Sequence, residues 1–221
     1  MLLEFTDFHN ATELFSGPLA SAWEQIKSVI MTTHVHLKES DQAGIQGNLI
    51  FDPVGTNFAI KQGLERLEWR SNVAIPRAFN FLGTDIDFVK FGLIVEVQFS
   101  NYPFLLNNTI RAELLFKSKT RLDASPIEAM VIITKAHMFP ASNSTLYYQQ
   151  AVNQLSELAR HNVVAVPIRL VGLFAPQGRT EAVFTNYHNP RYSRTITEQR
   201  TREVVVSGGR TPNSRARIAF A

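Results

Sequence analysis

The stretch Leu93 to Phe104, LIVEVQFSNYPF, places a carboxylate at Glu96 and an amide at Gln98 within an apolar run. Successive side chains of an extended strand point to opposite faces, so Glu96, Gln98 and Ser100 share one face at intervals of about 7 Å. The residues between them are apolar and share the other face. The spacing therefore predicts a strand with one face in the core and a polar row on the other.

Two more acids, Asp85 and Asp87, precede this strand in TDIDF. If IDF pairs with GLIV through a turn near Lys90, Asp87 sits beside Glu96. Two carboxylates in an apolar setting repel each other, and desolvation adds to the cost. A hard divalent cation removes both penalties, and Mg²⁺ accepts such sparse carboxylate sites and polarises phosphoryl oxygens. The pattern thus indicates a candidate Mg²⁺ site for phosphoryl chemistry.

An edge strand with Glu96 and Gln98 facing water explains the same residues. The pattern Asp-x8-Glu-x-Gln is not specific, and charged side chains on edge strands are common. Spacing alone therefore leaves the metal site and the solvated edge both open.

Two further polar clusters contain residue types that bind DNA. The segment FPASNS holds Asn143 and Ser144, which are able to contact base edges but also suit the cap of the following helix. The segment NPRYSRT holds Tyr192 between two arginines, and Arg194 could bond guanine or a backbone phosphate. Each cluster has a structural explanation as well as a functional one.

Positive charge is concentrated at the C-terminal end of the chain. Residues 191–221 contain seven arginines against two glutamates, a net charge of +5, whereas the whole chain carries +3. Such asymmetry favours a polyanionic partner, although a solvated basic tail explains it too. Together with the two polar clusters, the tail favours DNA.

Composition excludes several classes of site. The 221 residues suit a single domain, and the absence of cysteine excludes disulfides, thiolate metal sites and thiol nucleophiles. The start MLLEFTDFHN has no basic region before an apolar core, so we expect no signal peptide. The sequence contains no run of 18 apolar residues, so we expect no membrane span. We expect a cytoplasmic location.

The hydrophobic pattern alternates between helix and strand, which predicts an α/β core with a mixed sheet. Pro167 interrupts one expected strand and should bend it or place it at an edge. The expected helices are 19–31, 58–70, 106–119 (capped by Asn107 or Asn108) and one that begins near 142–144. The expected strands are 33–39, 93–99, 129–136 and 163–174, with short β runs at 194–198 and 202–207.

Several long motifs resemble the BglII family of type II restriction endonucleases, a branch of the PD-(D/E)xK nuclease superfamily. They are NLIFDPVGTN, FLGTDIDF, LIVEVQFSNYPFLLNNT, MFPASNS, VPIRLVGL and RYSRTIT, and the similarity extends from about residue 30 to 200. The resemblance implies a mixed β-sheet flanked by helices and an additional β subdomain. Within a single domain 1–221, the catalytic core would span about 30–175 and a β-rich DNA-binding part about 176–221.

The resemblance also implies roles for individual residues. Asp87 and Glu96 match the two acids of the site, and the backbone carbonyl of Val97 would complete the metal shell. Gln98 stands at the catalytic position where most of the superfamily has lysine, and its amide could orient water or phosphate. Asn72, in EWRSNVAIP, matches an asparagine that hydrogen-bonds the attacking water.

Base recognition in the family implies a second set of residues, and all six residue types are present here: Ser100, Asn101, Asn143, Ser144, Tyr192 and Arg194. The family pattern implies a homodimer that encircles a palindrome and cuts both strands of double-stranded DNA with Mg²⁺. The implied site is A^GATCT, or another site with a GATC centre, cut to leave four-base 5′ overhangs.

Two alternatives remain on the same fold. The first is a sequence-specific DNA-binding protein without catalysis, which the presence of Asp87, Glu96 and Gln98 argues against. The second is a structure-specific or repair nuclease, which the base-reading residues argue against. A neutral Gln98 cannot accept a proton at ordinary pH, so the sequence offers no side-chain base beside the metal.

Overall fold

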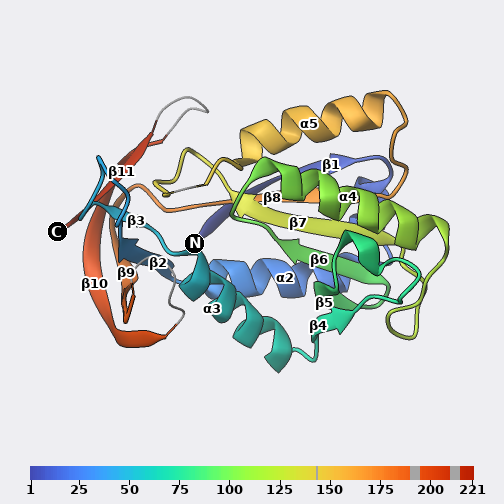
Figure 1. Ribbon diagram of the computed structural model, residues 1–221, viewed down its shortest axis with the longest axis horizontal. Helices are drawn as coiled ribbons and strands as arrows, with labels where there is room; N and C mark the ends of the chain where they lie inside the picture. Colours follow the sequence, from blue (N-terminus) through green and yellow to red (C-terminus); the bar gives the residue numbers. More distant parts are fainter. Residues whose placement is uncertain (143, 190–194, 210–214) are drawn as a thin grey trace.

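The computed structural model describes residues 1–142, 144–189, 195–209 and 215–221, which form two sheets (Figure 1). The six-stranded sheet has, in spatial order, β1 (Leu2–Phe8), β8 (Ile168–Phe174), β7 (Ala129–Lys135), β6 (Leu93–Val97), β5 (Asp85–Lys90) and β4 (Arg70–Ala74). The five-stranded sheet has β11 (Ala216–Phe220), β10 (Ile196–Gly208), β9 (Gly178–Tyr187), β2 (Val35–Glu39) and β3 (Leu49–Phe51).

Helices cover both faces of the six-stranded sheet, which confirms the expected mixed α/β class. On one face lie α1 (Ala11–Ser16) and α2 (Ala20–Thr32), and on the other lie α4 (Tyr102–Lys117) and α5 (Tyr148–Arg160) (Figure 1). Helix α3 (Pro53–Arg66) packs on α2, β2 and β4, and a 3₁₀ turn spans Asn80–Leu82. No helix in the described part of the chain is long and apolar enough to cross a bilayer.

Strand β6 is an interior strand, between β5 and β7. Leu93 and Val95 pack into the core beneath α2, while Ile94 packs into the core beneath α4 and α5. Glu96 is also buried. The interpretation of this segment as an edge strand facing water is therefore wrong, and the apolar residues serve two cores instead of one.

A tight turn brings the two acidic strands together. Phe91 and Gly92 both have positive φ, 55° and 74°, as a two-residue hairpin turn with native twist requires. The resulting register pairs Phe88 with Val95 and Val89 with Ile94, so Asp87 and Glu96 lie at opposite positions. The expected pairing of these strands is confirmed.

Helix α3 begins at Pro53 and ends at Arg66, not at residues 58 and 70 as expected, so DPVGTN forms its N-cap and first turn. Asp52 caps this helix by accepting a hydrogen bond from the Val54 N–H, and Pro53 occupies the first helical position, where it needs no hydrogen-bond partner. Asp52 also accepts a hydrogen bond of 2.7 Å from the Tyr187 hydroxyl of β9. This single carboxylate therefore ties the second sheet to α3.

Two helix starts differ from the expected ones. Helix α4 begins four residues early, with Asn101 as its N-cap, so Asn107 and Asn108 lie within the helix and do not cap it. Helix α5 has Tyr147 as its N-cap, and the caps expected at residues 142–144 are wrong. Asn107, Asn108 and Ser144 form hydrogen bonds to other segments of the chain and do not cap a helix.

The C-terminal strands also differ in detail. Pro167 precedes β8, which lies inside the sheet between β1 and β7, so the strand is neither interrupted nor at an edge. The described parts of the two short β runs expected near the C-terminus fall in one 13-residue strand, β10, which begins at Ile196; Arg194 lies outside the described residues. The division of the domain near residue 176 stays a prediction. The two sheets are not separated at that residue, since β2 and β3, from the first part of the chain, lie in the same sheet as β9, β10 and β11.

Gly63 tests the packing of α3 on α2. A Cβ added there would lie 2.5 Å from a methyl carbon of Val29. Alanine usually stabilises a helix relative to glycine by about 1 kcal/mol, but overpacking costs about 1–3 kcal/mol. We expect Gly63→Ala to lower the free energy of unfolding in a urea titration by up to about 2 kcal/mol.

Gln62→Ala, on the exposed face of the same helix, is the matched control and should be nearly neutral. Adding Val29→Ala should relieve the clash, so the double variant should be more stable than the sum of the single effects predicts. Strict additivity of the two substitutions would contradict the proposed contact.

Candidate functional site

A cavity of about 610 Å³ opens beside the paired acids. Asn72 of β4, Asp85 and Asp87 of β5, Val97 of β6 and Lys61 of α3 line it. The structure thus brings three residues that the sequence nominated, Asn72, Asp87 and Val97, to one concave surface. Together with the adjacent Glu96, they come from three neighbouring strands of the six-stranded sheet.

Asp87 and Glu96 form a carboxyl pair in which Glu96 is buried and Asp87 is half-buried at the cavity wall. Burial, and then the charge of Asp85, raises the pKa of Asp87, although the Val97 N–H donates to its Oδ2 at 2.7 Å and opposes the shift. Glu96 is 4% exposed, and burial followed by the charge of Asp87 raises its pKa to about 8. Lys61, which lines the cavity, pairs with Glu65 and with neither acid among the described residues.

Arg111 of α4 is the direct cationic partner of Glu96. One terminal nitrogen donates to Glu96 Oε1 and, at 3.2 Å, to Asn108 Oδ1; the other donates to the Leu82 carbonyl at 3.1 Å. The guanidinium opposes the rise in the Glu96 pKa. Arg111 thus fixes the orientation of the carboxyl group from the side away from the cavity.

Gln98 does not line the cavity in this structure. Its Oε1 accepts from Asn108 Nδ2 at 3.4 Å, and its Nε2 donates to the Ser100 hydroxyl. A continuous polar row therefore runs from Glu96 through Arg111 and Asn108 to Gln98. The row connects the acidic pair with the segment that follows β6.

Asn72 interrupts the ladder between β4 and β5. The pairs on either side, Ser71 with Phe88 and Val73 with Ile86, place Asn72 at the position opposite Asp87. Its φ of 48° is left-handed, a conformation that asparagine tolerates better than most residues and that is common at functional sites. The side chain is exposed and lines the cavity.

The residues at this cavity fit a hard divalent cation. The described residues contain no group of three or more histidines, aspartates or glutamates that could hold a metal. However, Mg²⁺ is typically bound by one or two carboxylates with other oxygens and water. Asp87, Glu96 and the Val97 carbonyl match that donor set, and a cation would offset the repulsion that raises both carboxyl pKa values.

A second cluster lies beyond the end of β6. The Ser144 hydroxyl lies 2.5 Å from the Phe99 carbonyl and 2.7 Å from the Ser100 carbonyl, and is placed to donate to either. Thr145 Oγ1 donates to Asn101 Oδ1 at 3.3 Å. Three expected base readers, Ser100, Asn101 and Ser144, are thus brought together. The other three, Asn143, Tyr192 and Arg194, lie outside the described residues.

Comparison with known proteins identifies the family of the chain. A family model for "Restriction endonuclease BglII/BglIII" matches residues 3–173. The chain belongs to this family. The type II restriction enzyme BglII of Bacillus subtilis is 51% identical over 218 residues, which cover 98% of this chain and 96% of that protein. The expected enzyme class, type II restriction endonuclease, is confirmed.

Solved BglII structures match the whole chain. The crystal structure of BglII complexed with a DNA 16-mer superposes with a TM-score of 0.93 at 49% identity, covering 100% of both chains. The crystal structure of free BglII superposes with a TM-score of 0.76 at 45% identity, again over 100% of both chains. The restriction-endonuclease fold expected from the sequence is therefore confirmed.

Arg111 is a residue of this BglII-family site that the sequence interpretation missed. The signal was present in LNNTIRAELLF, where Asn108 and Arg111 stand three residues apart on the helix face that also carries Leu105 and Leu115. A buried cation on an apolar helix face requires a partner. Its identity could not be deduced because Glu96 lies on a different element.

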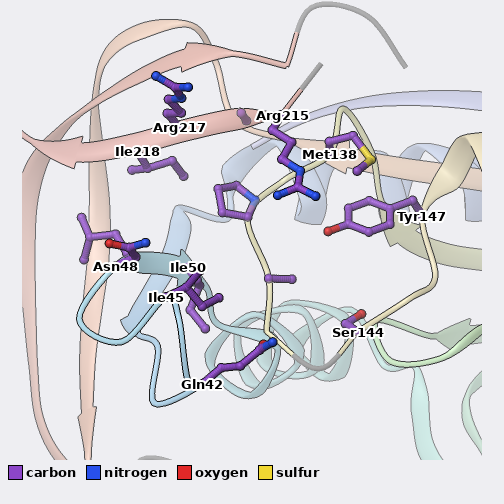
Figure 2. Close-up of a pocket in the computed structure, with 14 residues that line it drawn as sticks. Gln42, Ile45, Asn48, Ile50, Met138, Ser144, Tyr147, Arg215, Arg217 and Ile218 are labelled. Carbon is purple, nitrogen blue, oxygen red and sulfur yellow. The ribbon is translucent and has the colours of Figure 1, made fainter. Parts of the chain in front are cut away.

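A second cavity of about 630 Å³ lies beside the expected base readers of this BglII-family chain (Figure 2). Ser144 and Tyr147 line one side, while Arg215 and Arg217 approach from the C-terminal strand. Figure 2 shows the Arg215 guanidinium close to Tyr147 and Met138, with Arg217 pointing away. The described lining contains no acidic side chain, and neither arginine forms an ion pair with a described residue.

The raised pKa of Glu96 predicts how metal-free stability depends on pH. Its folded pKa of about 8 exceeds the ordinary value of 4.5, so the carboxyl group stays protonated in the folded protein after it ionises in the unfolded chain. Stability is therefore lost as pH rises from about 5 to 8. In EDTA, the Glu96→Gln variant should lose less of its free energy of unfolding over this pH range, by a few kcal/mol or less. Urea unfolding midpoints from pH 5 to 9 measure the difference.

Glu24→Gln, on the exposed side of α2, is the control for general charge effects. The difference in stability between Glu96→Gln and the parent protein should grow with pH, and the difference for Glu24→Gln should not. A constant difference for Glu96→Gln would mean that Arg111 keeps Glu96 ionised throughout.

Proposed function

We propose that this restriction endonuclease binds double-stranded DNA and hydrolyses its phosphodiester bonds with Mg²⁺ held by Asp87, Glu96 and the Val97 carbonyl. The observation that carries the proposal is the pair formed by buried Glu96 and half-buried Asp87 beside an open cavity, with raised pKa values and one arginine as direct partner. Mg²⁺ bound there would neutralise the pair and polarise a phosphoryl oxygen.

The protein residues around the metal have separable roles. Asn72 lies opposite Asp87 and lines the cavity, where its amide would orient the attacking water. Lys61 lines the same cavity and offers an ammonium group to a DNA phosphate. Gln98 faces Ser100 and Asn108 and cannot act as a proton acceptor, so its role is to position the recognition segment.

We assign the recognition sequence as AGATCT, or another site with a GATC centre, cut after the first base to leave four-base 5′ overhangs. The six expected reader types are present: Ser100, Asn101, Asn143, Ser144, Tyr192 and Arg194. The 51% identity with the type II restriction enzyme BglII and the likeness to its complex with a DNA 16-mer support this assignment.

The active assembly would be a homodimer. A palindromic site presents the same sequence on both strands, so a two-fold symmetric pair of chains meets each half-site with the same residues. One carboxyl pair in each chain then cuts one strand. The relative from Bacillus subtilis supports a bacterial and cytoplasmic setting for this activity.

Digestion of a plasmid of known sequence tests the function directly. With Mg²⁺ the protein should give discrete fragments that end at AGATCT sites, and a panel of NGATCN duplexes should identify the outer base pair. Asp87→Ala should reduce cleavage below detection and leave affinity for the cognate duplex unchanged or tighter, because a repulsive carboxylate is removed. Gel shifts in Ca²⁺ or EDTA measure that affinity.

Asp41→Ala, in the segment between β2 and β3, is the control for loss of an acidic side chain. It should cut like the parent protein. Cleavage by Asp87→Ala in Mg²⁺ would remove this carboxylate from the mechanism. Binding without cleavage by the parent protein would indicate an inactive DNA-binding protein, and smearing or nicking would indicate a structure-specific nuclease.

The cavity beside Ser144 is proposed to hold a backbone phosphate through Arg215. Removing one phosphate contact should weaken binding to cognate and random duplexes equally. It should also reduce the slope of log K for binding against log salt concentration by about 1. Arg215→Ala, measured by fluorescence anisotropy at several NaCl concentrations in EDTA, should show both effects.

Arg179→Ala is the matched control, because Arg179 is an exposed arginine already paired with Glu203 at 3.2 Å. It should leave the salt slope almost unchanged. A larger loss for the cognate duplex than for random DNA would make Arg215 a base reader instead of a phosphate contact.

A further inference from the structure

Lys135, at the end of β7, is a fully buried cation that the proposed hydrolysis does not use. Its side chain is 0% exposed. Its ammonium donates to the carbonyls of Phe99, at 3.0 Å, and Leu146, and to the Ser144 hydroxyl. It also lies 4.2 Å from the centre of the Tyr147 ring. None of the described residues forms an ion pair with it.

The partners of Lys135 belong to the two segments that carry expected base readers. Phe99 directly precedes Ser100 and Asn101, and Leu146 directly follows Ser144 and Thr145. One ammonium group therefore holds the chain after β6 and the chain before α5 at the same point. The contact is made in the interior, behind the surface that these readers form.

Direct hydrogen bonds between the two segments complete this junction. The backbone N–H groups of Thr145 and Leu146 both donate to the Ser100 carbonyl at 3.1 Å. The Ser144 hydroxyl is placed to donate to the Phe99 or the Ser100 carbonyl while it accepts from Lys135. A shift of either segment would therefore break several bonds that converge on one buried nitrogen.

Stability alone is a poor explanation for this lysine. Burial lowers the pKa of its ammonium to about 7, which shows that the charged form is disfavoured there. An apolar side chain of similar volume commonly packs at such a position with equal or greater stability. What the apolar side chain would lack is a set of directed donors that fixes the distance between the two segments.

We propose that Lys135 is a positioning residue that determines sequence specificity, by fixing the segment 99–101 against the segment 144–146. This inference rests on the proposed function, because it assumes that these segments read bases. The lysine acts through Phe99, Ser144 and Leu146 and not by contact with DNA, since its ammonium is enclosed by protein.

Lys135→Met tests the inference by keeping the side-chain volume and removing the donors. We expect the ratio of cleavage rates for AGATCT over duplexes with one changed base pair to fall at least tenfold. The parent protein must first cut AGATCT; if it does not, the proposed function fails before the inference is tested. A ratio equal to that of the parent protein, in a folded variant, would overturn the inference alone.

Arg169→Met is the matched control. Arg169 is a buried cation on the neighbouring strand β8, paired with Asp7 and packed against Phe5, Phe15 and Trp23. The Arg169→Met variant should be less stable than the parent protein and should cleave every duplex more slowly by a similar factor, so the selectivity ratio should not change. A fall in the ratio equal to that of Lys135→Met would mean that selectivity merely follows stability.

The absence of cysteine from the chain allows a chemical rescue that also covers poor folding of the methionine variant. Lys135→Cys can be alkylated in denaturant with 2-bromoethylamine, which rebuilds an ammonium group of nearly the length of lysine, or with 1-bromopropane, which gives a neutral chain. After refolding, the aminoethylated protein should recover the parent selectivity ratio within about threefold, and the propylated protein should not. Equal ratios for the two products would overturn the proposal.

Discussion

The buried carboxyl group of Glu96 sets the constraint that the surrounding structure satisfies. Such a group is unfavourable near a second acid unless positive charge and hydrogen-bond donors surround it. Here Arg111 approaches from α4, and the Val97 N–H holds Asp87 in place. On the cavity side, Lys61 is paired with Glu65 and forms no ion pair with either acid among the described residues, which leaves room there for a metal ion. The same arrangement that is costly for an empty site is favourable for an occupied one.

The start of α4 determines whether this arrangement forms. The helix begins at Tyr102, directly after its N-cap Asn101, so that Asn108 and Arg111 face the strand and reach Gln98 and Glu96. Asn101 is also an expected base reader. Recognition and catalysis therefore share one short connection, in which a change of one residue in length would rotate the arginine away from the acid.

Local rules in the sequence suggested the acidic pair. A turn near Lys90 before an apolar run would place Asp87 beside Glu96, and the observed register does so. The family motifs then gave the fold. Local rules failed for the caps of α4 and α5, because several polar residues stand near each start and tertiary contacts decide which one is used.

Roles that depend on distant partners were beyond the sequence. In the sequence, Arg111 and Lys135 are cations within apolar segments and have no evident partner. The structure shows that Arg111 contacts Glu96 and that Lys135 contacts Phe99 and Ser144. The burial of Glu96 was also unexpected, because the alternation of β6 suggested a single core and the fold places a core on each side. In each case the missing information was the position of another element.

The parallel pairing of β2 with β9 has a kinetic consequence. Val35 lies opposite Ala182, so the second sheet joins segments separated by more than 140 residues of chain. Such contacts form late, because the entropy of closing the intervening loop must be overcome before the strands stabilise each other. During synthesis β2 must wait for β9 to leave the ribosome. The pairing of β1 with β8 closes an even longer loop, but the acidic pair needs neither closure, because a two-residue turn joins β5 to β6. The chain should therefore assemble its acidic pair before the sheet that carries its arginine-rich end.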